Sequence, residues 1–153
     1  MKISFTILVL IFASSKAFSG AWGAGSFEND TALDWVHEVE NTKGTKVLLS
    51  TIGAVFSVTY KEVDLCTKAI AAIEVVATLK DGVTDNLPES LVSWVGSNKS
   101  PFEPEMAKFS LKAISYCKEL TNSELAQLWH EGDASEWLSV LKNLESRLSS
   151  ENQ

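Results

Sequence analysis

The densest group of side chains suited to recognition or catalysis lies between residues 20 and 35 of the chain. Aromatic side chains there offer apolar contact area, and carboxylate and amide groups beside them offer hydrogen-bond acceptors. The members are Trp22, Phe27, Asn29, Asp30, Asp34 and Trp35. One interpretation is a recognition surface. The other assigns Asn29-Asp30 to a helix N-cap and both tryptophans to buried anchors, and it accounts for most of these residues unaided.

Glu74 lies at the edge of an apolar helical pattern and is the second candidate for a catalytic role. A carboxyl group in such a setting could act as a general acid or base, with Asp30 or Asp34 as the second carboxylate. Structural pairing is the alternative, because a buried charge needs a fixed donor. The indole N–H of Trp22 and the α-amino group of Gly20 are the candidate donors.

Cys66 and Cys117 are the only cysteines and fall at core-facing positions of two predicted helices. A disulfide between them would close a loop of about 50 residues and stabilise the fold by about 4 kcal/mol in the chain-entropy model. Two buried free thiols are the alternative. His37 and His130 have no metal-ligand spacing, so the sequence predicts no metal and no cofactor.

Residues 1–19 are typical of a secretory signal peptide. Lys2 precedes an apolar run over residues 3–13, and Ala17-Phe18-Ser19 offers a cleavage site. The run is about 11 residues, well under the roughly 20 that span a bilayer, so we expect removal rather than a retained anchor helix. The sequence therefore predicts an exported protein, periplasmic or secreted, without stable membrane insertion.

The chain is acidic, with 13 Lys and Arg against 20 Asp and Glu and a formal net charge of −7. Without Lys2 and Lys16 it would have 11 basic residues, and the net charge would be −9. Such a surface repels nucleic acids and anionic lipids.

Hydrophobic periodicity predicts one all-α domain over residues 20–148, with six or seven short helices after a Gly/Trp-rich loop. The expected helices span 31–40, 47–60, 62–80, 88–95 and 104–120. A capping box at Thr121–Glu124 opens a short helix, and a similar signal at Asp133–Glu136 opens the last one, before a tail at 149–153. We expect the Gly/Trp-rich loop to dock on the alanine-rich helix 62–80.

The segment Gly20-Ala-Trp-Gly-Ala-Gly-Ser-Phe-Glu-Asn-Asp-Thr-Ala-Leu-Asp-Trp35 resembles the opening motif of a bacterial family, domain of unknown function 4259. Ala71-Ala-Ile-Glu-Val-Val-Ala77, Leu87-Pro-Glu and Asn122-Ser-Glu-Leu-Ala-Gln-Leu-Trp129 are similar to three further family blocks. The resemblance implies a largely helical fold and assigns no activity.

Family members that begin Met-Gly-x-Trp-Gly would expose the same glycine that signal cleavage leaves first here. We therefore hypothesise that the charged α-amino group of Gly20 is part of the folded motif, paired with Asp30, Asp34 or Glu74.

Three functions are compatible with these features. The first is a non-catalytic exported protein that binds a partner protein, expected to be basic, as immunity proteins and inhibitors do. The second is a small envelope hydrolase that uses Glu74 with Asp30 or Asp34. The third is a small-ligand-binding module that uses the aromatic cluster.

Overall fold

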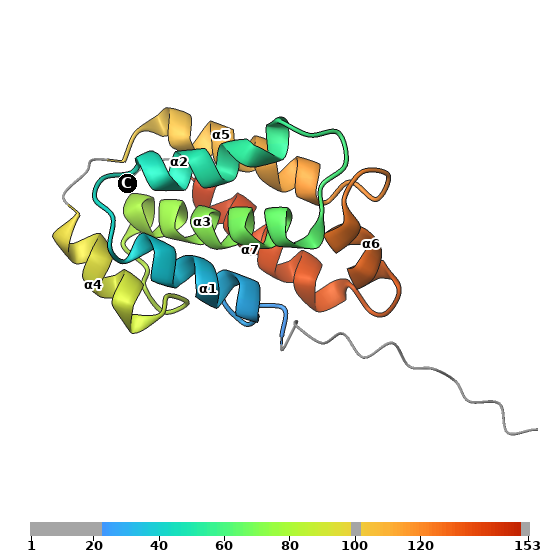
Figure 1. Ribbon diagram of the computed structural model, residues 1–153, viewed down its shortest axis with the longest axis horizontal. Coiled ribbons are helices and arrows are strands. Elements are labelled where there is room, and N and C mark those ends of the chain that lie inside the picture. The colour runs from blue at the N-terminus through green and yellow to red at the C-terminus, as the bar shows by residue number, and fades with distance from the viewer. Residues whose placement is uncertain (1–22, 99–101, 151–153) are drawn as a thin grey trace, which may run out of the picture.

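The computed structural model describes residues 23–98 and 102–150. Within these ranges the chain forms seven α-helices, one 3-10 helix and no β-strand, so the all-α prediction is confirmed (Figure 1). The helices are α1 (Asp30–Val39), α2 (Lys46–Gly53), η1 (Ala54–Phe56), α3 (Val63–Asp81), α4 (Glu89–Ser97), α5 (Pro104–Cys117), α6 (Glu124–His130) and α7 (Ser135–Ser149).

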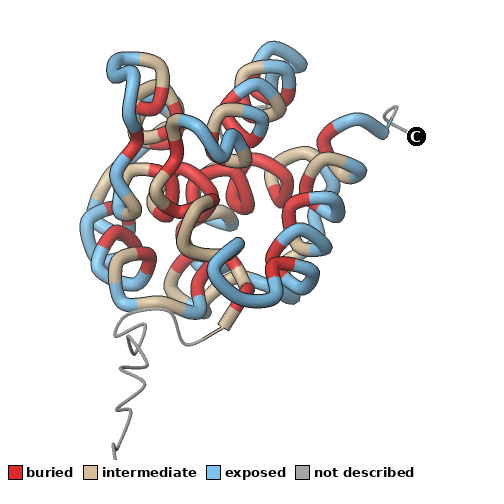
Figure 2. The backbone as a smooth tube through the Cα atoms, turned by 90° about the vertical axis from the view of Figure 1, so that its right-hand side faces the viewer, coloured by how far each residue is buried: buried red, intermediate tan, exposed pale blue. Residues whose placement is uncertain are grey.

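Helix α3 is the centre of the molecule and packs against each of the other six α-helices. In Figure 1, α2 and α5 lie on one side of it and α1 on the other, and Figure 2 shows the buried residues gathered in the middle. Every residue from 69 to 78 is buried. A helix that is apolar on all sides must be enclosed by others, and its many alanines allow their close approach. No described helix combines the length and apolar character that a membrane crossing requires.

Several sequence signals mark the helix ends as predicted. The Asn29 side chain accepts a hydrogen bond from the Ala32 N–H at 2.8 Å and caps α1. Gly82 ends α3 with a φ of 76°, a left-handed conformation that glycine adopts without steric cost. Pro104 lies in the first turn of α5, where its missing N–H leaves no hydrogen bond unmade.

The predicted helix over 47–60 is shorter than expected. Helix α2 ends at Gly53 and continues only as the 3-10 turn η1, and Val58 and Tyr60 lie beyond it, exposed. Tightening into a 3-10 turn is a common way for a helix to end. A Cβ atom on Gly53 would lie 3.3 Å from the Phe109 ring, so the glycine also permits close packing of α2 on α5.

The junction before α6 differs from the predicted capping box. Helix α5 ends at Cys117, and Leu120 lies outside it, 49% exposed. Ser123 rather than Thr121 caps α6, since its side chain accepts from the Ala126 N–H. The Glu124 carboxylate instead accepts from the N–H of Val63 at 3.0 Å and caps α3, a partner that is 61 residues away.

Two other helix starts are shifted by one or two residues. Pro88 is the N-cap of α4 and not part of its first turn. Hydrogen bonds from the Ser135 side chain and from its N–H, the latter at 2.9 Å, lower the pKa of the Asp133 carboxyl group. Helix α7 begins at Ser135. Helix α7 extends through Ser149 into the predicted tail, whose last three residues lie outside the described ranges.

Candidate functional site

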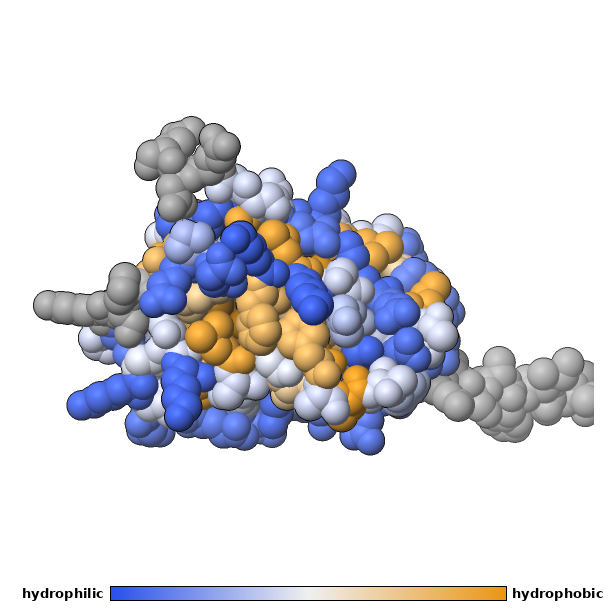
Figure 3. All heavy atoms as spheres, turned by 90° about the horizontal axis from the view of Figure 1, so that it is seen from above, coloured by the Kyte–Doolittle hydropathy of each residue, from blue (hydrophilic) through white to orange (hydrophobic). Residues whose placement is uncertain are grey.

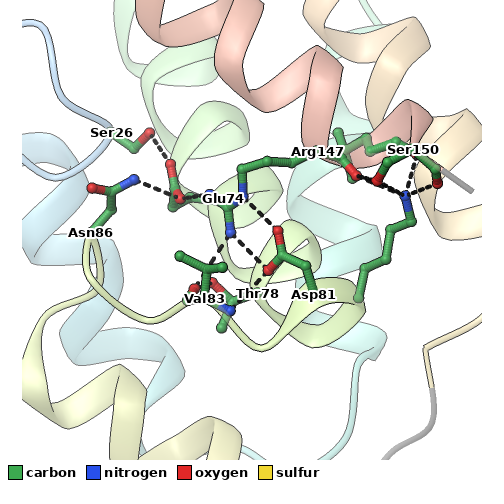
Figure 4. Close-up of polar contacts among 10 residues, drawn as sticks. Ser26, Glu74, Thr78, Asp81, Val83, Asn86, Arg147 and Ser150 are labelled. Carbon is green, nitrogen blue, oxygen red and sulfur yellow. Dashed lines mark hydrogen bonds and ion pairs between the residues drawn. The ribbon is translucent and has the colours of Figure 1, made fainter. Parts of the chain in front are cut away.

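Glu74 lies in the middle of α3 with its side chain only 3% exposed. One carboxylate oxygen, Oε2, accepts from the Ser26 hydroxyl at 2.9 Å. The other, Oε1, accepts from the Asn86 side-chain amide at 3.3 Å and forms an ion pair with Nη1 of Arg147 (Figure 4). Both oxygens of the buried carboxylate are thus hydrogen-bonded, as a buried charge requires.

Arg147, on α7, joins Glu74 to a second carboxylate on α3. Its Nε donates to Oδ2 of Asp81 at 2.7 Å and its Nη2 to Oδ1 at 3.1 Å, a bidentate pair. Nη2 also lies 3.4 Å from the carbonyl oxygen of Val83. Glu74 and Asp81 are about two turns apart on one face of α3, which places both within reach of one guanidinium group.

The pKa values of Asp81 and Arg147 reflect this geometry. Partial burial alone would raise the pKa of Asp81, but hydrogen bonds from Arg147 and the Val83 N–H and the positive charge of Arg147 outweigh it and lower the pKa. Burial would lower the pKa of Arg147, and its contacts with Asp81 and Glu74 raise it instead. Both groups are therefore held in their charged forms.

The glycine-rich segment positions Ser26 in this network. The Gly25 N–H donates to Oε2 of Glu28 at 2.8 Å, and the Gly23 N–H donates to the Glu28 carbonyl oxygen at 3.2 Å. A Cβ atom on Gly25 would lie 2.9 Å from Cδ of Glu28, so the loop closes tightly on that side chain. The described part of the segment therefore docks on α3, as expected, and does so through the Ser26–Glu74 hydrogen bond.

The remaining residues of the opening motif have mostly structural positions. Trp35 is 2% exposed and its indole N–H donates to the Thr51 hydroxyl at 3.0 Å. Phe27 is part of the core. Asp30 and Asp34 are exposed on α1. Gly20 and Trp22 lie outside the described residues, and so do the predictions that rest on them.

The arrangement around Glu74 is suited to holding segments together. Its hydrogen-bond partners in the described part of the chain are Ser26, Asn86 and Arg147, and neither Asp30 nor Asp34 is among them. This geometry does not support a pair of catalytic carboxylates. No three His, Cys, Asp or Glu side chains among the described residues are grouped as a metal ion would require.

Sequence reasoning missed the donor that neutralises Glu74. The chain has 13 basic residues, and Arg147 is the only arginine among them. The sequence therefore did indicate that this position requires arginine in particular. Only arginine offers a planar fork that bonds two carboxylates at once. Ser26, Asp81 and Asn86 carried no comparable signal, because polar residues in turns and at helix ends are common.

Cys66 and Cys117 form a disulfide that joins α3 to α5, with their Cα atoms 5.5 Å apart. Both residues are fully buried. Of the two arrangements that the sequence allowed, a disulfide or two buried free thiols, the structure has the disulfide.

An open groove of about 370 Å³ lies between the start of α5 and the end of α7. Its apolar lining residues are Phe102, Pro104, Ala107, Leu111 and Leu148. Its charged lining residues are Lys80 and Lys108, and no carboxylate is among the lining groups. Lys80 also donates to the carbonyl oxygens of Arg147 at 2.7 Å and Leu148 at 3.0 Å, and so caps α7 (Figure 4).

Comparison with known proteins gives one match. Residues 20–140 match the model of a family described as a domain of unknown function (DUF4259). No curated protein and no solved structure matches the chain.

Proposed function

The chain belongs to the family of the domain of unknown function DUF4259, and we propose that this member is an exported, non-catalytic protein that binds a partner protein. The proposal rests on the burial and the hydrogen-bond partners of Glu74. This residue is the best placed candidate for acid–base catalysis, and its carboxylate is buried and already bound by Ser26, Asn86 and Arg147. A group in that state holds segments together, which leaves the molecular surface for recognition.

Export is supported by two independent features. Residues 1–19 have the pattern of a secretory signal peptide. The Cys66–Cys117 disulfide is a bond that persists in oxidising compartments such as the periplasm and is rare in the cytosol.

An immunity- or inhibitor-like role suits a small, disulfide-linked helical domain of strong negative charge. With residues 1–19 removed the net charge is −9, which keeps the protein soluble and steers the approach of an oppositely charged partner. The net charge therefore favours a partner that is basic overall.

The test has two parts, both with the full chain expressed in its native host. N-terminal sequencing of the envelope fraction should find Gly20 as the first residue, and a start at Met1 would contradict export. Chemical cross-linking in that fraction, followed by mass spectrometry, should identify one protein that also binds the purified chain in calorimetry. Absence of any such protein would contradict the binding role.

The groove between α5 and α7 favours a second candidate, a module for a small amphiphilic anion. Its apolar walls suit an alkyl or aromatic group, and Lys108, which is exposed and also ion-paired with Glu105, offers a cation at the rim for a carboxylate. Calorimetry with decanoate tests it. Binding to the wild type that Leu111→Glu abolishes would support this candidate, and absence of heat would refute it.

A further inference from the structure

We infer that the partner docks on the surface formed by α2, η1 and α5, and that it presents an acidic segment with apolar side chains there. This inference rests on the proposed function and names the docking surface and the chemistry of the partner. We call this surface the α2/α5 face. It is the side of the molecule seen in Figure 3, where hydrophobic residues gather between hydrophilic ones.

An aromatic cluster forms the centre of the α2/α5 face. The Phe56 ring lies 5.0 Å from the Phe109 ring and 5.1 Å from the Tyr116 ring, measured between centroids. All three residues pack against the core and are only partly buried. Aromatic residues anchored in this way are the type that contributes most to binding at protein interfaces.

Apolar exposure continues where η1 and α5 end. Val58 is 43% exposed, Tyr60 48% and Leu120 49%, and these are three of the most exposed large hydrophobic residues in the described part. Gln127 links two of them, since it accepts from the Tyr60 hydroxyl at 3.1 Å and donates to the Leu120 carbonyl oxygen at 2.7 Å. The apolar surface is therefore held in place and does not depend on a freely moving loop.

The charge of this face is opposite to that of the whole chain. Helix α2 and η1 contain no Asp or Glu and include the exposed Lys46, and α5 carries the exposed Lys108 and Lys112 with one carboxylate, Glu105. Lys112, on α5, places its Nζ 5.2 Å from the centroid of the Phe56 ring, and no carboxylate of a described residue forms an ion pair with it. In a chain of net charge −7, a face whose helices carry three lysines (Lys46, Lys108 and Lys112) against one glutamate, Glu105, is a local exception.

Charge complementarity therefore selects an acidic segment for this face, even if the partner is basic overall. Orientation in a complex depends on the local potential where the two surfaces meet. An anionic membrane fits less well, because only a few lysines would face the bilayer and the net negative charge of the chain opposes their attraction to it.

The experiment selects peptides from a random display library on the purified exported protein. Selected sequences should be rich in Asp and Glu interleaved with Leu, Phe and Trp. A synthetic peptide of the selected sequence should shift the amide resonances of α2, η1 and α5 in nuclear magnetic resonance spectra. Lys112→Glu should weaken its binding at least about tenfold in fluorescence anisotropy, and higher salt should weaken it too.

Lys142→Glu is the matched control, since Lys142 is an exposed lysine on α7, outside the α2/α5 face. It makes the same charge change and should leave peptide binding within about twofold of the wild type. The melting curve of Lys142→Glu should match the wild type, and that of Lys112→Glu should fall only by the small contribution of the exposed cation–π contacts with Phe56 and Tyr116.

Four results would overturn the inference. They are the selection of basic peptides or of none, amide shifts confined to other helices, preferential binding to phosphatidylglycerol vesicles, and self-association through this face in sedimentation experiments. If cross-linking still identifies a partner, only the docking face is wrong. If acidic peptides bind this face but cross-linking finds no partner, the proposed function fails and the recognition chemistry of the face stands.

Discussion

Arg147 and Glu74 lie 73 residues apart in the sequence and form a buried ion pair between α7 and α3. The same guanidinium group holds Asp81, the last residue of α3. The two contacts attach the C-terminal helix to the central one. Through Ser26 and Asn86, Glu74 also attaches the glycine-rich loop and the segment before α4.

Arg147→Met should destabilise the protein by about 3–5 kcal/mol, because it leaves the Glu74 carboxylate buried without its cation. Urea unfolding followed by circular dichroism measures this change. Lys142→Met is the matched control on the exposed side of α7 and should change the free energy of unfolding by less than about 0.5 kcal/mol.

A double variant shows whether the destabilisation comes from losing the ion pair or from leaving the Glu74 charge buried without a partner. Glu74→Leu combined with Arg147→Met removes both charges and should recover much of the stability lost in Arg147→Met. A double variant that is no more stable than Arg147→Met would show that the buried charge is not the cause.

Asp81 should contribute to acid sensitivity. Its pKa is below the ordinary 3.8 in the folded protein, because contacts with Arg147 and Val83 outweigh partial burial. A depressed folded-state pKa stabilises the protein above the unfolded value, and this contribution is lost as the pH falls through the folded value. In Asp81→Asn, the free energy of unfolding should therefore fall less steeply below about pH 4 than in the wild type. Equal slopes for the two proteins would argue against this role.

The disulfide should contribute about 4 kcal/mol to stability, since the 51-residue separation of Cys66 and Cys117 restricts the unfolded chain. Cys66→Ala with Cys117→Ala should lower the urea midpoint, and a reducing agent should lower that of the wild type alone. A double variant that still responds to reductant would mean that the reductant acts elsewhere.

Lys80 should hold the end of α7. Its ammonium group donates to the carbonyl oxygens of Arg147, Leu148 and Ser150, which have no partner within the helix. Lys80→Met keeps the apolar stem and should cost about 1–2 kcal/mol. Hydrogen exchange should accelerate in the last turn of α7, and unchanged exchange there would contradict the capping role.

The opening motif can be tested for a structural role at Asn29. Asn29→Ala removes the cap of α1 and should cost about 1 kcal/mol of unfolding free energy. Asp30→Asn is the control, because Asp30 is exposed and its amide analogue keeps the shape of the side chain. If Asp30→Asn alters partner binding without changing stability, the recognition interpretation of this carboxylate gains support.

Local patterns predicted the elements more accurately than their ends. Helix α3 was predicted to within a residue, because its apolar periodicity and the Asp81-Gly82 stop are local signals. The region 47–60 was predicted as one helix, since the sequence does not show that Phe109 packs on Gly53 and that the chain tightens into η1. Ser123 caps α6 in place of the predicted Thr121, and the Glu124 side chain accepts from the Val63 N–H on another helix.

The amino-acid sequence by itself determined the helical class, the family, the alanine-rich central helix and the need for a partner at Glu74. These follow from composition, periodicity and the cost of an unpaired buried charge, all of which are local or general properties. Only the tertiary structure decided that the partner is Arg147 and that lysines and aromatic rings share one face of an acidic molecule. Such pairings join residues that are far apart in sequence, and no local pattern determines which distant side chains meet.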